Sequence, residues 1–354
     1  MPLPPLYGHT GPRNRLVGAI ASGRLPQALL FEGPRGVGKQ RLALWLAQAV
    51  LCEGQGSKEA SGEPCGSCQP CRLVLSLSHP DVHWLVPLEL SKKGGDADRQ
   101  VELVEEGLGE EMAARRQRPL YEPPSGLAIH GIAAIRLLLR RMALKPALGR
   151  RKVFVIGDAE RLVPQTGTDA AANALLKALE EPPADTVFVL TTATAESLLP
   201  TILSRVVRVR VARLADSIVA AFVQHELGKT TQDDVAQLVA RADGAPGRLL
   251  AEREGGVAGG DAAARFLAAV RGGPLKRHVF ALAQQPFQAR GAFTAMLDGL
   301  LEELRRQARS GRETQRVVRA ISQVLEARAM AQGNVNPQLV AAVLAGDLAG
   351  GEAA

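Results

Sequence analysis

The segment at residues 33–40, GPRGVGKQ, carries residue types that bind phosphate. Seven of its eight positions fit the phosphate-loop pattern G-x-x-x-x-G-K-[S/T], in which backbone N–H groups surround phosphate oxygens and the lysine contacts the terminal phosphates. Gln40 stands at the eighth position, where a hydroxyl should coordinate Mg²⁺. The sequence therefore predicts a nucleotide site that is weakened on its magnesium side. Its phosphate-binding residues are Gly33, Gly36, Gly38 and Lys39.

The four cysteines of the chain lie in one short stretch with the spacing C-x12-C-x2-C-x2-C: Cys52, Cys65, Cys68 and Cys71. A C-x-x-C turn places two sulfurs on one ion, and four thiolates form the tetrahedral ligand set of a structural zinc site. The alternatives are a pair of disulfides, which are rare in proteins without a secretion signal, and a redox-active C-x-x-C pair. A third and fourth cysteine at ligand spacing favour the metal, so we predict structural Zn²⁺.

Strands and helices are predicted to alternate along the first part of the chain. The pattern indicates strands at residues 28–31, 79–87, 153–162 and 186–194, with a fifth after residue 205; the first is predicted to be buried and the third is apolar. The phosphate loop lies between the first strand and an amphipathic helix, which is the context that such a loop needs. This order predicts an α/β fold with a parallel sheet.

The strand signals end near residue 212, and the rest of the pattern is helical. We predict three parts: an α/β core at residues 1–211, a small helical lid at 212–258 and a C-terminal helical domain at 259–354. Inside the core we place a zinc module at residues 52–71. The charged, weakly periodic segment at 88–126 is predicted to be a mobile surface insertion.

The net charge of +7 permits binding to a polyanion without requiring it. The densest basic stretch contains no acid and reads as a solvated face or as a salt-sensitive phosphate-backbone contact. Its residues are Arg136, Arg140, Arg141, Lys145, Arg150, Arg151 and Lys152. No apolar run reaches the ~18 residues of a membrane span, and no signal peptide is recognisable, so we expect a cytoplasmic protein.

Five segments in order resemble the clamp-loader AAA+ family of bacterial DNA polymerase III. They are RLPQALLFEGPRGVGK, the cysteine knuckle after the first helix, HPDVHWL, NALLKALEEPP and LPTILSRV, and they span most of the chain. The resemblance implies an AAA+ P-loop core, a three-helix lid and a helical collar that builds a pentameric ring. It also implies partners: the gamma/tau and delta subunits through the collar and AAA+ faces, the sliding clamp, and primed DNA within the assembly.

The family has catalytic members and a silent one, and its Walker B strand ends in Asp-Glu. Here Gly157 replaces the magnesium aspartate and Asp158 stands at the base position; in a second register Asp158 is the magnesium residue and Ala159 replaces the base. Gly247 stands where the family has the sensor-2 arginine, with Arg248 one residue further. The resemblance therefore implies that the pair of acids is incomplete and that sensor 2 is displaced.

Two other family elements are retained. Thr192 matches the sensor-1 position at the end of the fourth strand. Ser204-Arg205 matches the start of the family's Ser-Arg-Cys motif, although Val206 replaces the cysteine. The resemblance implies that Arg205 is an arginine finger, which stabilises charge on the phosphoryl group of a neighbouring subunit's ATP.

These features predict a clamp-loader subunit that has no ATPase activity of its own, supplies Arg205 in trans and helps to load the sliding clamp onto primed DNA. The alternatives are an active gamma-type ATPase of the same family and a stand-alone zinc-containing nucleic-acid-binding protein. A small-molecule P-loop kinase lacks a recognisable pair of carboxylates. The sequence leaves open whether the loop holds ATP or ADP, and whether the zinc module contacts DNA or protein.

Overall fold

The computed structural model describes residues 3–56, 63–89, 96–118, 120, 128–162, 169–229, 231–253, 258–284, 290–309, 314–332 and 335–350. Its internal contacts divide the chain into two compact units. The first contains Met1–Pro123, Ala128–Pro164 and Thr168–Leu250, and the second contains Ala251–Ala354. No helix among the described residues is long and apolar enough to cross a membrane.

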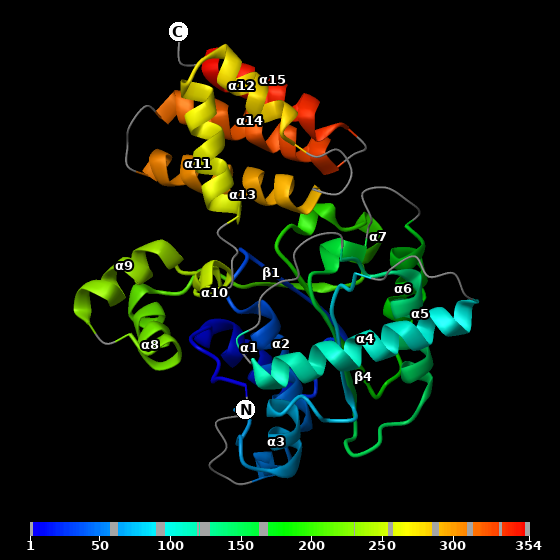
Figure 1. Cartoon of the computed structure of the whole chain (residues 1–354). Coiled ribbons are helices and arrows are strands. Elements are labelled where there is room, and N and C mark those ends of the chain that lie inside the picture. The colour runs from blue at the N-terminus through cyan, green and yellow to red at the C-terminus, as the bar shows by residue number, and fades with distance from the viewer. Residues whose placement is uncertain are drawn as a thin grey trace. The chain divides into compact units, whose positions relative to one another are not determined.

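A parallel five-stranded sheet forms the centre of the first unit (Figure 1). Its strands are β1 (Ala28–Glu32), β2 (Val82–Leu85), β3 (Lys152–Ile156), β4 (Thr186–Thr192) and β5 (Val207–Arg210), in the spatial order β2-β3-β4-β1-β5. Every residue of β3 and β4 is buried, because helices cover both faces of a parallel sheet. The predicted α/β fold with a parallel sheet is thereby confirmed.

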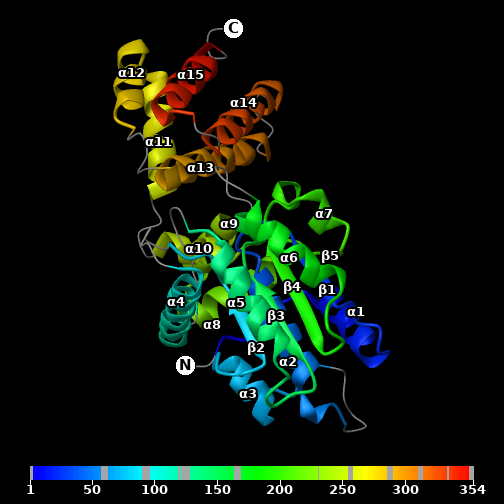
Figure 2. The same ribbon diagram turned by 90° about the vertical axis from the view of Figure 1, so that its right-hand side faces the viewer.

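Helices flank the sheet of the first unit (Figure 2). Those of the first unit are α1 (Thr10–Ala21), α2 (Lys39–Leu51), α3 (Gln69–Leu75), α4 (Ala97–Gln117), α5 (Ile132–Ala143), α6 (Ala170–Glu180), α7 (Pro200–Leu203), α8 (Asp216–Leu227), α9 (Gln232–Ala242) and α10 (Gly247–Arg253). Helix α2 begins directly at the phosphate loop, and α6 ends before two prolines that cannot continue it.

Helix α4 lies within residues 88–126, the segment predicted to be a mobile surface insertion. It spans 21 residues, and Asp96 caps it by accepting the N–H of Arg99 at 2.8 Å. Val101, Val104 and Leu108, three and four positions apart, form a narrow stripe that is buried in the core. The charged residues around this stripe concealed its period. Residues 90–95, 119 and 121–127 of the predicted insertion lie outside the described residues.

The basic stretch before β3 is partly neutralised, in contrast to its reading from sequence as an acid-free patch. Arg140 forms an ion pair with Asp98 of α4, and Arg141 forms one with Glu105 at 2.8 Å. Lys152 is buried, and its ammonium group donates to main-chain carbonyls at the end of α5. The acids that α4 supplies therefore reduce the charge that this stretch can offer to a polyanion.

The helices after β5 form a small apolar cluster that remains within the first unit. Its buried residues are Leu214, Val219, Phe222, Val223, Val235, Ala242, Leu249 and Leu250. Tyr7 from the N-terminal segment joins this cluster: its ring lies edge-on to Phe222 at 5.4 Å, and its hydroxyl donates to Glu226 at 2.7 Å. The predicted division at residues 211 and 258 into three domains stays a prediction.

The second unit is entirely helical within its described residues. Its helices are α11 (Ala258–Arg271), α12 (Pro274–Leu282), α13 (Arg290–Arg309), α14 (Thr314–Gln332) and α15 (Pro337–Gly350). Phe266, Phe293 and Leu297 lie at the centre of a separate apolar core. The predicted helical C-terminal region is therefore confirmed.

One buried carboxylate, Asp81, fixes the loop between α5 and β3. It accepts hydrogen bonds from the backbone N–H groups of Ala147, Leu148 and Gly149, the last two at 2.8 and 2.7 Å. Burial alone would raise the pKa of Asp81, but these three hydrogen bonds, with His79 nearby, lower it overall. The carboxylate of the HPD segment thus holds the loop that carries the basic stretch.

We expect Asp81→Asn to destabilise the chain by about 2 kcal/mol at neutral pH, because the charge-assisted hydrogen bonds to three backbone N–H groups are lost. The folded-state pKa of Asp81 is lowered, so its stabilisation is present above the unfolded-state pKa of about 4 and disappears as the pH falls through the folded-state value. Urea unfolding at neutral and acidic pH measures both effects. Glu181→Gln, at an exposed carboxylate, is the control; equal stability of the two variants at neutral pH would contradict the anchoring role.

Candidate functional site

The phosphate loop joins β1 to α2 at the carboxyl edge of the sheet, where ligand sites of parallel α/β folds lie. Gly38 precedes α2 with φ 97°, a left-handed conformation that favours glycine. His9, which sequence reasoning missed, is buried beside the loop, and its Nε2 lies 2.7 Å from the carbonyl oxygen of Val37. The loop is therefore built as its sequence pattern predicts and is held from the N-terminal side.

Lys39 points back into the loop. Its Nζ donates to the carbonyl oxygens of Gly33 at 2.9 Å and Pro34 at 2.8 Å. Burial lowers the pKa of Lys39 to about 8, although the carboxylates of Glu160 and Asp158 oppose this shift. The ammonium group thus lies within the curve of the loop, where the pattern places phosphate oxygens.

The side chain of Gln40 occupies the position that a magnesium-binding hydroxyl would take. Its Oε1 accepts the indole N–H of Trp84 at 3.1 Å, and its Nε2 donates to Asp158 Oδ2 at 3.1 Å. A Cβ atom at residue 157 would lie only 2.7 Å from Gln40 Oε1, so Gly157 provides the space that this amide fills. Gln40 and Gly157, which both depart from the family pattern, therefore pack against each other.

Two further contacts hold the end of β3 in place. Burial lowers the pKa of His130 to about 4, which keeps the ring neutral, and its Nε2–H donates to the carbonyl oxygen of Gly157 at 2.6 Å. Asp158 adopts a left-handed conformation with φ 51°, and its N–H donates to Thr191 Oγ1 at 3.2 Å. The carboxylate of Asp158 thereby faces the amide of Gln40.

Thr192, the predicted sensor-1 residue, is buried at the end of β4 beside the loop. Its carbonyl oxygen accepts the N–H of Gly33 at 3.3 Å, and its hydroxyl accepts the N–H of Thr194 at 3.1 Å. The structure thus brings Thr192 to the phosphate loop. Its hydroxyl stabilises the turn after β4.

Gly247 brings the backbone at the start of α10 directly onto the phosphate loop. Its N–H donates to the carbonyl oxygen of Gly36 at 2.9 Å, and a Cβ at residue 247 would lie 2.7 Å from Gly36 Cα. Arg248, the next residue, donates to Asp243 Oδ2 at 3.2 Å, and Arg213 donates to the same oxygen at 2.6 Å. The contact to the loop is therefore made by a glycine backbone, while the adjacent guanidinium group is paired with Asp243.

Arg205 follows the short helix α7. In the sequence it is far from the phosphate loop of its own chain. Its Nη2 donates to Glu180 Oε1 at 2.5 Å, and its Nη1 donates to Thr201 O at 2.8 Å and Ser204 Oγ at 3.2 Å. The side chain remains 31% exposed. Val206, which replaces the cysteine of the family motif, is buried in the core. The guanidinium group is thus held in one position and is still reachable from solvent.

The four cysteines converge as a metal site requires. One ligand atom from each lies within 4.8 Å of all the others, and the Sγ atoms of Cys52 and Cys68 are 3.9 Å apart. Tetrahedral zinc with Zn–S bonds of about 2.3 Å needs sulfurs about 3.8 Å apart. The N–H groups of Cys65 and Cys68 point at the sulfurs of Cys52 and Cys65, at 3.4 and 3.3 Å. This donor set fits Zn²⁺, and residues 57–62 of the module lie outside the described residues.

The thiol groups differ in acidity in the absence of a metal. Hydrogen bonds from Cys68 and Ser67 lower the pKa of the exposed Cys65 to about 6, whereas burial raises the pKa of Cys52 and of Cys71. A Zn²⁺ ion binds the thiolate form, so it would supply the positive charge that the buried sulfurs need.

Glu63 anchors the cysteine module to the core, a role that sequence reasoning missed. Its carboxylate accepts hydrogen bonds from Arg13 Nη2 at 2.6 Å and from the indole N–H of Trp45 at 3.0 Å. The Arg13 guanidinium also lies 5.3 Å from the centroid of the Trp45 ring. The module is therefore tied to α1 and α2 only two residues before Cys65.

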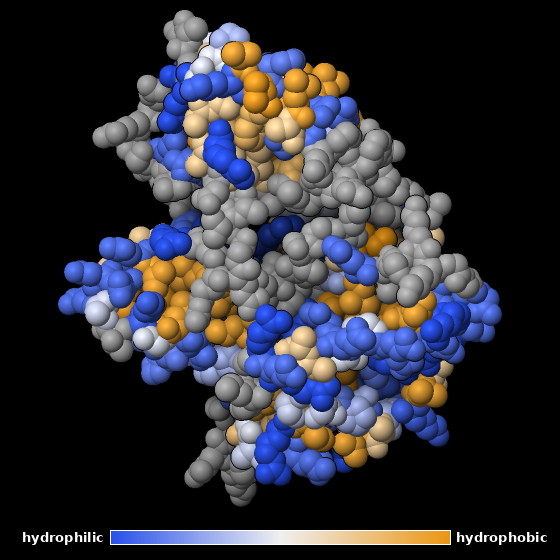
Figure 3. Space-filling view, in the orientation of Figure 1, coloured by the Kyte–Doolittle hydropathy of each residue, from blue (hydrophilic) through white to orange (hydrophobic). Residues whose placement is uncertain are grey.

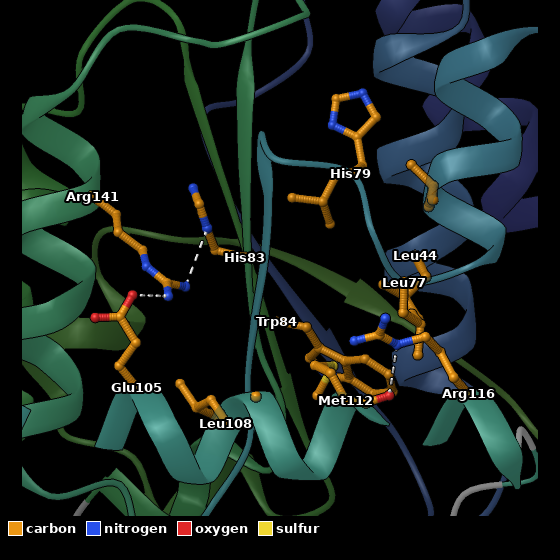
Figure 4. A pocket seen from close by; sticks show the side chains of 13 residues that line it. Leu44, Leu77, His79, His83, Trp84, Glu105, Leu108, Met112, Arg116 and Arg141 are labelled. Atoms are coloured by element: carbon orange, nitrogen blue, oxygen red, sulfur yellow. Dashed lines mark hydrogen bonds and ion pairs between the residues drawn. The ribbon is translucent and has the colours of Figure 1, made fainter. Parts of the chain in front are cut away.

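A cavity of about 310 Å³ lies elsewhere in the first unit, beneath α4 (Figure 4). Leu44, Leu77, Trp84, Leu108 and Met112 supply much of its apolar lining, and the Arg141–Glu105 ion pair lies at one side. The predicted nucleotide, zinc and finger residues do not line it. The cavity lies where α4 packs against the core, and the residues of the phosphate loop do not line it.

Comparison with known proteins gives one consistent family. A family model described as "DNA polymerase III, delta subunit" matches residues 8–215. The DNA polymerase III subunit delta′ of Bacillus subtilis is 33% identical over 190 residues, which are 54% of this chain and 43% of that protein. The Escherichia coli subunit delta′ is 31% identical over 243 residues, 68% of this chain and 59% of that protein. The chain thus spans about half the length of these curated relatives.

Two other similarities point to proteins of related name. The subunit gamma/tau of Mycobacterium tuberculosis H37Rv is 31% identical over 230 residues, 64% of this chain and 32% of that protein. The solved structure of a gamma subunit-related protein from Thermotoga maritima is 15% identical, covers 95% of this chain and 97% of that one, and gives a TM-score of 0.41.

We expect the purified chain to hold one Zn²⁺, measured by atomic emission, and Cys71→Ser to lose it because a tetrahedral set with three thiolates binds zinc more weakly.

Gly54→Ala is a subtler test of the same site. A Cβ there would lie 2.9 Å from Cys65 Sγ, so we expect the zinc affinity to fall about tenfold or more. Gly109→Ala, where a Cβ meets nothing within 4 Å, is the control. A metal-free wild-type chain, or unchanged affinity in Gly54→Ala, would contradict the assignment.

Proposed function

Since the chain belongs to the delta′ family of DNA polymerase III clamp-loader subunits, we propose that it works in such a loader without ATPase activity of its own. It assembles with gamma/tau and delta subunits, supplies Arg205 in trans and helps to place the sliding clamp on primed DNA. A cytoplasmic location and a structural Zn²⁺ belong to the same proposal. The match to the family confirms the resemblance that the five sequence segments indicated.

The observation that carries the proposal is the packed amide of Gln40. Phosphoryl transfer at a phosphate loop needs Mg²⁺ to neutralise charge on the β- and γ-phosphates, and a hydroxyl and an acid to hold that ion. Here the hydroxyl is replaced, its space is filled, and Asp158 already accepts the N–H of the amide. The contacts of Gln40, Gly157 and Asp158 therefore oppose a hydrolytic metal site.

We expect isolated wild-type chain to show no Mg²⁺-dependent ATP turnover, because the residues that would hold the ion are engaged with one another. If nucleotide binds through Lys39 and the loop, its Kd should agree within about twofold with and without Mg²⁺, since Gln40 replaces the hydroxyl that would bind the ion and its amide already donates to Asp158. Calorimetric titration with ADP in magnesium or in chelator tests this, and Lys39→Ala is the control for binding at the loop. Rapid Mg²⁺-dependent ATP turnover, or a lower Kd for ADP in the presence of Mg²⁺, would contradict the proposal.

The geometry of Arg205 supports its proposed role as an arginine finger. A finger must be held in place yet reach a phosphate on another subunit, and Arg205 is hydrogen-bonded at both terminal nitrogens while 31% exposed. Residue 206 lies in the core, so the change from cysteine to valine leaves the guanidinium group unaffected.

In a loader reconstituted with its gamma/tau and delta subunits, we expect Arg205→Ala to slow hydrolysis at the adjacent ATP site by roughly 10³-fold. Arg210→Ala, an exposed arginine on β5, is the matched control and should leave the rate unchanged. Single-turnover hydrolysis in a complex whose other sites are inactivated measures both. Equal rates for the two variants, with assembly intact, would count against the finger.

An exposed apolar face on the second unit supports assembly with other subunits (Figure 3). Leu275, Val279 and Leu282 recur at helical spacing on α12 and are 76%, 58% and 57% exposed. Helix α15 packs beside α12 and adds Leu339 and Val343 to the exposed apolar residues. We propose that this face contacts the helical C-terminal domain of a neighbouring loader subunit, because exposed apolar groups of this number mark protein interfaces.

We expect Val279→Ser to weaken assembly of the loader about tenfold, since burying a valine at an interface contributes about 1.5 kcal/mol. Val318→Ser on α14 is the matched control, because the two valines are 58% and 53% exposed. Both variants should unfold like wild type. Analytical ultracentrifugation of the reconstituted complex distinguishes them, and an equal loss in both would remove the special role of the α12 face.

A further inference from the structure

Two segments that are far apart in the sequence meet at Arg205. The first is the end of α6, where Glu180 is the last helical residue and two prolines follow. Gln27, at the start of β1, fixes this turn: its Nε2 donates to the carbonyl oxygens of Pro183 at 2.6 Å and Thr186 at 3.2 Å. The turn that follows Glu180 is therefore tied to the sheet.

The second segment is α7, which places Arg205. Pro200 occupies its first turn, where a missing N–H costs nothing, and Ile202 is fully buried. The carbonyl oxygen of Thr201 and the hydroxyl of Ser204 then accept hydrogen bonds from Nη1 of Arg205. Glu180 provides the contact from outside this segment, at 2.5 Å from Nη2.

We propose that Glu180 is a positioning residue for Arg205, and this inference rests on the proposed function. An arginine side chain loses substantial rotamer entropy when it is fixed, and a finger that is fixed in advance avoids that loss when the neighbouring subunit docks. Contacts to Glu180, Thr201 and Ser204 engage Nη1 and Nη2. Among the described residues no contact engages Nε–H, so this edge of the guanidinium group is open to a phosphoryl oxygen.

The negative charge of Glu180 acts in the opposite direction, because it partly offsets the charge that Arg205 offers to phosphate. The two side chains are 31% and 45% exposed, so water and salt screen this opposing effect. Holding the Arg205 side chain in position lowers the barrier through geometry, and water and salt do not screen this effect in the same way. We therefore expect removal of Glu180 to slow the reaction.

The test uses the reconstituted loader with all other ATP sites inactivated. Glu180→Ala should lower the single-turnover rate about 3- to 10-fold without changing the nucleotide concentration that gives half of this rate, because only positioning in the transition state is lost. Glu181→Ala, at the next residue, is the matched control and should behave as wild type. Glu180→Met keeps the length of the side chain and removes the oxygen that accepts the Nη2–H of Arg205, so it gives the same comparison if the alanine variant assembles poorly.

A double-variant comparison separates positioning from a general structural effect. In an Arg205→Ala chain, Glu180→Ala should have no further effect on the rate, because its target is gone. If Arg205→Ala alone does not slow hydrolysis, the proposed finger fails. If Arg205→Ala slows it but both Glu180 variants match Glu181→Ala, or exceed wild type, the role of Glu180 alone is overturned. Additive losses in the double variant would also overturn it.

Discussion

The pairing of the three central parallel strands is the constraint on which the geometry around the phosphate loop depends. The register aligns Glu32 of β1 with Thr192 of β4, so the phosphate loop and the turn after β4 leave the sheet at the same level. β3 ends beside them and delivers Asp158, whose N–H is fixed by Thr191. Because backbone hydrogen bonds set this arrangement, it persists whether or not the side chains at the edge can perform catalysis.

Several side chains to which the sequence assigned no role hold the functional groups in place, and each does so through a short polar contact. Glu63 ties the cysteine module to Arg13 and Trp45, as Asp81 ties the basic loop to the sheet. Gln27 fixes the proline turn after α6. Supports of this kind fit the proposed role, in which the chain presents groups to neighbouring subunits.

The sequence predicted the central strands β1, β3 and β4 well, because strands that are almost wholly buried read as continuous apolar runs, and it predicted the cysteine cluster from spacing alone. It could not reveal α4, whose apolar stripe is narrow and surrounded by charge. It predicted that Gln40 damages the metal site, but not that Trp84 and Asp158 bind its amide, since those contacts depend on tertiary structure. The partner of Arg205 was equally hidden: Glu180 stands in a recognised motif, but nothing local links the two residues.

The fit between Gln40 and Gly157 limits how this chain could change over evolutionary time. An aspartate at residue 157 would require the amide of Gln40 to move, because its oxygen would lie 2.7 Å from the new Cβ, while a threonine at residue 40 would remove the hydrogen bond that the indole N–H of Trp84 donates to Gln40. Restoring the family residue at either position therefore changes the surroundings of the other residue. Positions 40 and 157 are coupled through the side chain of Gln40, so substitutions at the two positions are not independent of each other.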